Sequence, residues 1–222
     1  MPPRRGQAPH AYHLEELRLA REAAPRHRPP PMPAGARVLE VGCGAGQQLV
    51  VNYPDHQTVG IDIDASALAL GRTLTTTVAF TRGMAEQLPF KNDYFDLVFA
   101  RVSLPYTDIN QSVREIHRVL KPGGKVWLMM HSLSLCVKLA MRGNAKSKLI
   151  FFYILANGAA LHWFGRQFHV GRFQETFQTS RGMRRALERA GFSNIAIARD
   201  RAFIVTASCT IGGQDVPHPG SG

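Results

Sequence analysis

The chain has 222 residues, of which 45% are hydrophobic and 19% are charged, and its formal net charge is +11. This length suits one α/β domain with extensions at its ends, and the apolar fraction is large enough for a sizeable core, which excludes a largely disordered chain. The cysteines Cys43, Cys136 and Cys209 are far apart in the sequence, which argues against a disulfide framework or a zinc site and favours a reducing, cytoplasmic setting.

The positive charge is unevenly distributed along the chain. Residues 1–37 carry seven basic and three acidic side chains, residues 38–130 carry eight and nine, and residues 131–222 carry twelve and four. The excess at the two ends is either a solvated surface or a site of attraction for an anionic substrate, RNA or an acidic membrane. No secretory signal is expected, because no apolar run follows the first arginines.

The predicted elements alternate between strand and helix. Residues 1–11 and 25–34 are rich in Pro and Arg and are expected to be loop or disordered, with a short amphipathic helix at 12–21 between them. Strands are expected at 37–41, 58–62, 77–82, 95–101 and 125–131, and helices at 47–52, 65–74 and 109–120. Residues 121–124 (KPGG) are expected to stop the last helix and form a turn. The alternation predicts a doubly wound, mostly parallel α/β sheet.

Residues 132–180 interrupt this alternation, and we expect them to be mostly helical. Their apolar run at 149–164 is shorter than the roughly 20 residues that cross a membrane, so a buried or interfacial helix is expected. A helix at 181–190 and a closing antiparallel pair of strands at 194–199 and 203–210 follow. The sequence thus predicts an N-terminal arm at 1–34, a core at 35–131, a helical insert at 132–180, the last helix and strands at 181–211, and a disordered tail at 212–222.

A glycine-rich loop follows the first predicted strand, in the sequence Gly42-Cys43-Gly44-Ala45-Gly46. Glycine permits close approach of the backbone to a ligand, and the free N–H groups of the following helix would face that ligand. Dinucleotide sites prefer the spacing G-x-G-x-x-G, whereas this loop has G-x-G-x-G with Glu40 in front of it. An acid at that position favours a ligand with an ammonium group and no phosphate, such as S-adenosylmethionine.

Two acids end the second predicted strand. Asp62 lies beside the glycine loop, where one carboxylate can accept both hydroxyls of a ribose. Asp64 precedes Ala65-Ser66-Ala67 and is expected mainly to cap the next helix.

Four blocks in this order resemble the class I S-adenosylmethionine-dependent methyltransferases, and in particular the small-molecule enzymes that include those of quinone biosynthesis. The blocks are VLEVGCGAG at 38–46, VGIDID at 59–64, GMAEQLPF at 83–90 with Phe95-Asp96, and RVLKPGG at 118–124. The resemblance covers about residues 38–130. It implies a Rossmann-like, seven-stranded sheet that ends in an antiparallel pair of strands.

The resemblance also implies a role for individual residues. Glu40 and the backbone of Gly42, Cys43, Gly44 and Gly46 would hold the methionine part of the cofactor, and Asp62 its ribose. Ile63 would pack on the adenine ring, Met84 and Ala85 would line its edge, and Arg101 and Val102 would border the amino group. Relatives usually have Asp where this chain has Met84, so a weaker contact with the adenine amino group is expected here.

Candidates for a general base are His131 at the end of the fifth predicted strand, His162 and His169 in the insert, and Tyr106 after the fourth strand. His131 would lie at the carboxyl edge of the sheet, where ligands of this class of fold bind. Each histidine also has an ordinary structural interpretation, and methyl transfer can proceed by proximity without a dedicated base. The catalytic residue is therefore left open.

The aromatic side chains of the insert predict an apolar or aromatic acceptor, since such a wall suits a lipophilic ligand. A homodimer interface and shallow membrane docking, with Lys146, Lys148 and Arg166 flanking the apolar run, are the alternatives. We therefore expect a methyltransferase that modifies an O, N or C atom of a small lipophilic acceptor, with no metal. The alternatives are an RNA methyltransferase, suggested by the basic C-terminal third, and an inactive cofactor-binding partner protein.

Overall fold

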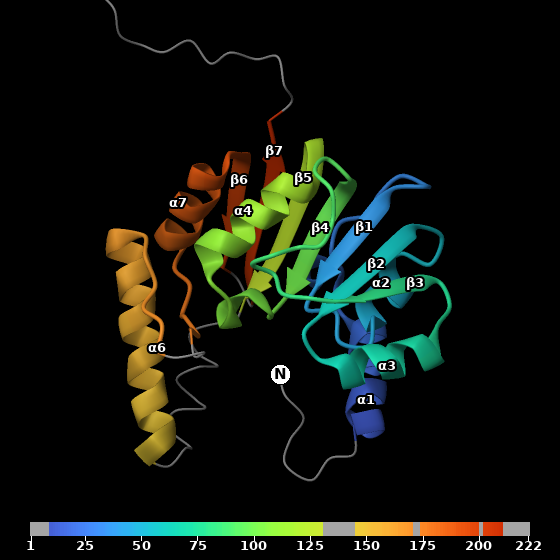
Figure 1. The fold of residues 1–222 in the computed structure, drawn as a ribbon, viewed down its shortest axis with the longest axis horizontal. Coiled ribbons are helices and arrows are strands. Elements are labelled where there is room, and N and C mark those ends of the chain that lie inside the picture. Colours follow the sequence, from blue (N-terminus) through green and yellow to red (C-terminus); the bar gives the residue numbers. More distant parts are fainter. Residues whose placement is uncertain (1–8, 131–144, 171–173, 200–201, 211–222) are drawn as a thin grey trace, which may run out of the picture.

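The computed structural model describes residues 9–130, 145–170, 174–199 and 202–210. Its centre is a seven-stranded sheet in the order β3-β2-β1-β4-β5-β7-β6 (Figure 1). The strands are β1 (Arg37–Val41), β2 (Gln57–Asp62), β3 (Val78–Arg82), β4 (Phe95–Arg101), β5 (Leu120–Met130), β6 (Phe192–Ala198) and β7 (Phe203–Cys209). The first five are mutually parallel, and β7 runs antiparallel to both β5 and β6. The predicted fold class and the closing antiparallel pair are confirmed.

Helices cover both faces of the sheet (Figure 1). They are α1 (Pro9–Glu22), α2 (Gln47–Asn52), α3 (Ala65–Leu74), α4 (Ile109–Val119), α6 (Ala145–Phe164) and α7 (Ser180–Ala190), with short 3-10 helices η1 (Pro25–His27) and η2 (Leu104–Tyr106). The predicted helices at 47–52 and 65–74 agree with α2 and α3 at both ends.

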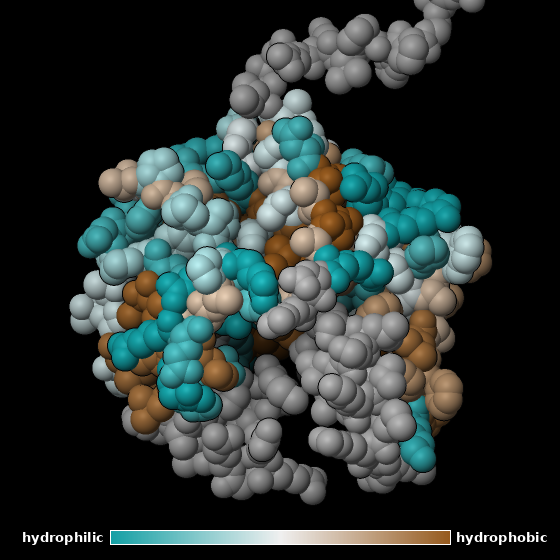
Figure 2. All heavy atoms as spheres, turned by 180° about the vertical axis from the view of Figure 1, so that it is seen from behind, coloured by the Kyte–Doolittle hydropathy of each residue, from teal (hydrophilic) through white to brown (hydrophobic). Residues whose placement is uncertain are grey.

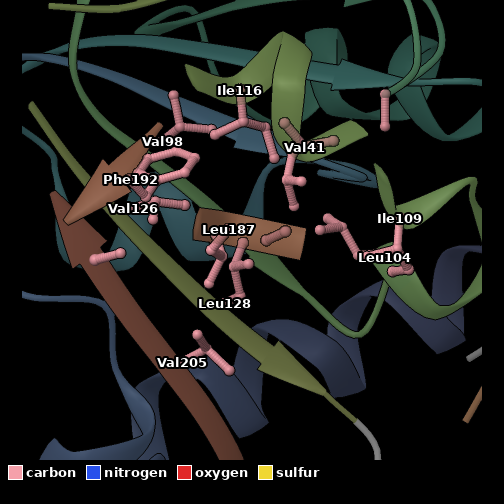
Figure 3. Close-up of a cluster of buried hydrophobic side chains, with 14 of the residues drawn as sticks. Val41, Val98, Leu104, Ile109, Ile116, Val126, Leu128, Leu187, Phe192 and Val205 are labelled. Atoms are coloured by element: carbon pink, nitrogen blue, oxygen red, sulfur yellow. The ribbon is translucent and has the colours of Figure 1, made fainter. Parts of the chain in front are cut away.

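The strands bury alternate residues on the two faces, because successive side chains of a strand point in opposite directions. On one face, Val98 and Leu128 pack against α4 and α7 through residues such as Ile116 and Leu187 (Figure 3). On the other face, the core is smaller and gathers the large side chains Leu49, Tyr53, Leu97, Phe99 and Trp127. The sheet is thus buried on both sides, as the near-continuous apolar runs of its parallel strands require.

The KPGG segment differs from the prediction. Rather than a free turn before a strand at 125, β5 begins at Leu120, and its pairing with β4 shifts between Phe95↔Leu120 and Leu97↔Lys125. The extra residues bulge out, with Gly123 at a φ of 76°. A hydrogen-bonded ion pair of 2.6 Å between Lys121 Nζ and Asp96 Oδ1 holds the bulge on β4.

The order of the strands predicts a ligand-binding crevice at the carboxyl ends of β1 and β4. From β1 the chain proceeds outward to β2 and β3, and it then returns to β4 and β5 on the other side of β1. Ligands of open α/β sheets bind where the strand order reverses in this way. In Figure 1, α1 and α6 extend beyond this edge of the sheet on opposite sides of it.

Candidate functional site at the carboxyl edge of the sheet

The glycine loop leaves β1 in a backbone conformation that favours glycine. Gly42, Gly44 and Gly46 have φ values of 76°, 55° and 79°. The N–H groups of Gly42 and Cys43 both donate to the carbonyl oxygen of Ile61 on β2, at 2.8 and 3.1 Å. The loop is therefore held on the neighbouring strand, and α2 begins directly after Gly46.

Packing within the protein gives a second reason for two of these glycines. A Cβ atom on Gly42 would collide with the side chain of Ser103, and one on Gly46 would lie 2.8 Å from the ring of Phe80. Ser103 is itself fixed, because its hydroxyl donates to the carbonyl oxygen of Val41 at 2.6 Å. Close approach of a ligand is therefore not the only reason for glycine at positions 42 and 46, because neighbouring side chains already leave no room there for a Cβ atom.

Asp62 at the end of β2 connects the glycine loop to the start of α3. Its Oδ2 accepts the N–H of Gly44 at 2.8 Å, and its Oδ1 accepts the N–H of Asp64 at 2.9 Å. These bonds fix the plane of the carboxylate and leave lone pairs on both oxygens for a ligand. Asp64 caps α3 by accepting the N–H groups of Ser66 and Ala67, as predicted.

Ile63 and Met84 offer exposed apolar side chains near Asp62. Ile63 is 67% exposed and Met84 52% exposed, whereas Ala85 is buried. The N–H of Gly83 donates to the backbone oxygen of Asp62 at 3.0 Å, which ties the loop before Met84 to the end of β2. Exposed side chains of this size suit the face of a flat aromatic ring.

Glu40 is a buried charged residue on β1, and Arg101 on the neighbouring strand β4 is half-buried. Within the described residues, Glu40 Oε2 and Arg101 Nε have no hydrogen-bond partner. Burial raises the pKa of the Glu40 carboxyl well above its ordinary value; the positive charge of Arg101 opposes this rise and the negative charge of Asp62 adds to it. Buried polar atoms without a partner are rare and costly, which makes this position a candidate binding site for a polar group.

The backbone is unusual where β4 ends. Val102 has a φ of 60°, although it is β-branched, and its N–H donates to the carbonyl oxygen of Met129 at 2.7 Å. A residue of this kind in the left-handed region costs on the order of 1–3 kcal/mol, and such strain concentrates at functional sites. Val102 is one of the residues assigned to the site by resemblance.

Two of the candidate bases, His162 and His169, contact residues at the starts of helices. His162 Nδ1 lies 2.8 Å from the hydroxyl of Thr179, which caps the first turn of α7, so this histidine has a structural contact. His169 Nε2 lies 3.5 Å from the carboxylate of Asp108, the N-cap of α4. Tyr106 lies in η2 and is partly exposed. His131 is outside the described residues.

Two polar residues, Glu86 and Gln167, connect the start of α4 to the segment after α6. The sequence did not single them out. The Glu86 carboxylate oxygen Oε1 accepts both the N–H of Asp108, at 3.0 Å, and the amide of Gln174, at 2.7 Å. The Gln167 side chain accepts the N–H of Ile109 at 2.7 Å and donates to the backbone oxygen of Thr107 at 3.0 Å. Three of these four bonds join residues more than 50 positions apart, so local sequence pattern cannot reveal them.

The described residues offer no metal site, no membrane-spanning helix and no reactive cysteine. No group of three metal-binding side chains was found among these residues. Their helices include none that is both long and apolar enough to cross a membrane. Cys43 lies in the glycine loop, and burial raises the pKa of its thiol, so it is not a ready nucleophile.

Comparison with known proteins gives a consistent result. Residues 39–128 match the family model of a methyltransferase domain. An uncharacterized methyltransferase of Synechocystis is 39% identical over 95 residues, which are 40% of this chain and 44% of that protein. A demethylmenaquinone methyltransferase of Chlorobaculum parvum is 31% identical over 96 residues, 42% of this chain and 40% of that protein. The chain therefore matches less than half the length of these relatives.

A solved structure supports the same fold. The crystal structure of a protein of Methanosarcina mazei, described as a SAM-dependent methyltransferase, superposes with a TM-score of 0.57 at 19% identity and covers 81% of this chain and 95% of its own. Residues 39–128, which match the methyltransferase domain model, contain the glycine loop and Asp62.

Proposed function

Because residues 39–128 match the family model of a methyltransferase domain, we propose that this chain transfers the methyl group of S-adenosylmethionine to a small lipophilic or aromatic acceptor. The observation that carries the proposal is the buried Glu40 oxygen without a partner, next to Arg101 at the crevice of the sheet. A buried carboxylate needs a cationic or donor group to offset its burial. The ammonium group of the cofactor supplies one.

The other site residues fit the remaining parts of the same molecule. Asp62 presents both oxygens of a fixed carboxylate, as a ribose with two neighbouring hydroxyls requires. Ile63 and Met84 would hold the adenine ring between apolar side chains, and Ala85 would border its edge. The backbone of Gly42 to Gly46 would hold the methionine chain, with Arg101 and Val102 closing that end.

In this proposal the protein acts mainly by positioning the acceptor against the methyl group, and less by transferring a proton. The cofactor supplies an activated methyl group, so the protein must place an acceptor atom in line with it and exclude water. His162 and His169 are engaged in structural contacts, and neither they nor Tyr106 is assigned as the base here. We assign residues 132–180 as the segment that covers the acceptor.

The chemical class of the acceptor follows from the side chains of that segment. Its described residues include Phe151, Tyr153, Leu155 and Phe168, none of which is buried. The relative from Chlorobaculum parvum is a methyltransferase of demethylmenaquinone, whose name indicates an aromatic, lipophilic acceptor. We therefore favour a hydroxylated aromatic or quinone-like ring.

The test begins with the cofactor. Isothermal titration with S-adenosylhomocysteine is expected to give a dissociation constant in the micromolar range, and an acceptor screen should then detect release of S-adenosylhomocysteine from S-adenosylmethionine with hydroxylated aromatic or quinone-like compounds. The Asp62→Ala variant serves as the background of the screen. Failure to bind either cofactor form at millimolar concentration would refute the proposal, and binding without release across the screen would favour the inactive partner protein.

A further inference from the structure

The outer side of α6 carries a continuous apolar stripe that faces solvent. We define the α6 stripe as its exposed residues at spacings of three and four: Leu149, Phe152, Ala156, Ala159 and Trp163. This spacing places them on one side of a helix. Leu149 is 71%, Phe152 65% and Trp163 61% exposed. A surface helix ordinarily has charged or polar residues on this side.

The opposite side of α6 is already used within the protein. Asn157 accepts the N–H of Phe168 at 2.6 Å and donates to the backbone oxygen of Glu175 at 3.2 Å. Gly158 lies so close to Phe177 that a Cβ atom there would be 2.5 Å from its carbonyl oxygen. Leu161 belongs to the main core. The α6 stripe therefore points away from the fold, and Figure 2 shows apolar surface on the side where α6 lies.

Positive charge surrounds the stripe. Residues 145–199 contain nine Lys or Arg and two acids, Glu175 and Glu188. Arg181 lies over the Trp163 ring, with its Cζ 5.4 Å from the ring centroid, and Arg185 donates to the Trp163 carbonyl oxygen at 2.9 Å. Lys148 is exposed at the other end of the stripe.

We propose that the α6 stripe docks the protein onto an anionic lipid surface, with the helix lying in the plane of the interface. Apolar side chains flanked by cations are the features of an interfacial helix, and Trp is favoured at the level of the headgroups. A second copy of this chain would bring two strongly basic surfaces together, which disfavours a symmetric dimer through this helix. This proposal does not depend on the methyl transfer proposed above.

The two tryptophans provide a direct measurement. Trp127 is 4% exposed and belongs to the core, whereas Trp163 lies on the stripe. Vesicles of phosphatidylcholine with 30% phosphatidylglycerol are expected to shift the fluorescence of the full chain to shorter wavelength. The Trp163→Phe variant should lose that shift and still co-sediment with the vesicles. A shift that survives in Trp163→Phe would overturn the assignment of the contact to this helix.

Substitutions then separate the apolar and charged contributions. Phe152→Glu should lower vesicle binding at least tenfold, while Leu74→Glu, at an exposed position of α3, should leave it nearly unchanged. Since one basic side chain near an anionic surface contributes about fivefold in partitioning, Arg181→Gln should weaken binding by about that factor. Lys125→Gln, exposed on β5, is the matched control.

Three outcomes would overturn the proposal. Vesicle binding that is equal in Phe152→Glu and Leu74→Glu would show that the stripe is not the contact. A stable dimer in sedimentation equilibrium that Phe152→Glu dissociates would assign the stripe to a second copy of the chain. Binding to single-stranded RNA that competes with vesicles and is weakened by Arg181→Gln but not by Phe152→Glu would assign the surface to nucleic acid.

Discussion

The cofactor half of the molecule and the α6 region differ in what each leaves without a partner. Around β1 and β4, polar atoms of Glu40 and Arg101 are buried and unpaired within the described residues. Around α6, Asn157 and Gln167 bond extensively, and it is apolar side chains such as Phe152 that face water. The first arrangement suits a small charged ligand, and the second suits an extended apolar surface.

The largest expected effect separates the two acids at the end of β2. Asp62→Ala should weaken S-adenosylhomocysteine binding about 100-fold, because hydrogen bonds to a charged group contribute about 1.5–3 kcal/mol each. Asp64→Ala is the matched control: it removes the cap of α3 at a cost of about 1 kcal/mol of stability and should leave affinity nearly unchanged. Isothermal titration measures both. Equal losses of affinity would refute the division of roles between these carboxylates.

In the α6 region we expect the opposite result, in which a substitution lowers stability and leaves cofactor affinity nearly unchanged. Gln167→Ala should lower the free energy of unfolding by about 2 kcal/mol, because the N–H of Ile109 loses its acceptor. Cofactor affinity should change less than twofold. Urea denaturation compares this variant with Gln111→Ala, whose exposed side chain makes one bond of 3.1 Å to the Glu86 carbonyl oxygen. If both variants are equally stable, the bonds of Gln167 do not anchor this segment.

Glu40→Gln is expected to move stability and affinity in opposite directions. The folded-state pKa of Glu40 is raised, so its contribution to stability is fully present below the ordinary pKa of glutamate and is lost as pH rises. At neutral pH the substitution should therefore raise the melting temperature, while it weakens S-adenosylhomocysteine binding about tenfold through loss of a charge-assisted bond. Thermal unfolding and titration on the same samples check both effects.

The pH dependence of the unmodified protein sharpens this prediction. A ligand cation stabilises the ionised form of Glu40, so binding should release a proton and become tighter as pH rises toward neutrality. Titrations in buffers of different ionisation enthalpy count that proton. Glu40→Gln should abolish the release, and an unchanged proton count would show that another group titrates.

The smallest expected change concerns the adenine side. Met84→Asp should tighten S-adenosylhomocysteine binding threefold to tenfold, because a carboxylate there can accept a hydrogen bond from the adenine amino group. A hydrogen bond to a buried charged group contributes about 1.5–3 kcal/mol, and an exposed one contributes less. Ile63→Asp adds the same charge close by but removes an apolar contact with the ring, so it should weaken binding. Tighter binding in both variants would indicate a general effect of charge.

Much of this architecture was predictable, because short-range patterns determine it. Buried apolar runs ended by glycine mark β1, and the N-cap Asp64 marks the start of α3. The KPGG segment was predicted as a turn, and the prediction was wrong in that β5 starts before it. Pairing of Leu120 with Phe95 depends on the neighbouring strand and is invisible in the local sequence.

The site was only partly predictable for the same reason. Glycines at 42 and 46 are conspicuous in the sequence, but their packing against Ser103 and Phe80 depends on contacts across the fold. The bonds of Gln167 and Glu86 likewise join distant segments. The contact of His162 with Thr179 also joins residues that are far apart in the sequence.

The single carboxylate oxygen of Glu86 has a consequence for how the molecule opens. Because it accepts the Asp108 N–H, the loop that carries Glu86 cannot separate from the start of α4 without freeing that amide, and Gln174 ties the segment after α6 to the same oxygen. Local openings of that kind are what hydrogen exchange detects. The exchange rate of this one amide should therefore report when the loop of Glu86 separates from the start of α4, and a ligand that holds this loop in place would slow it.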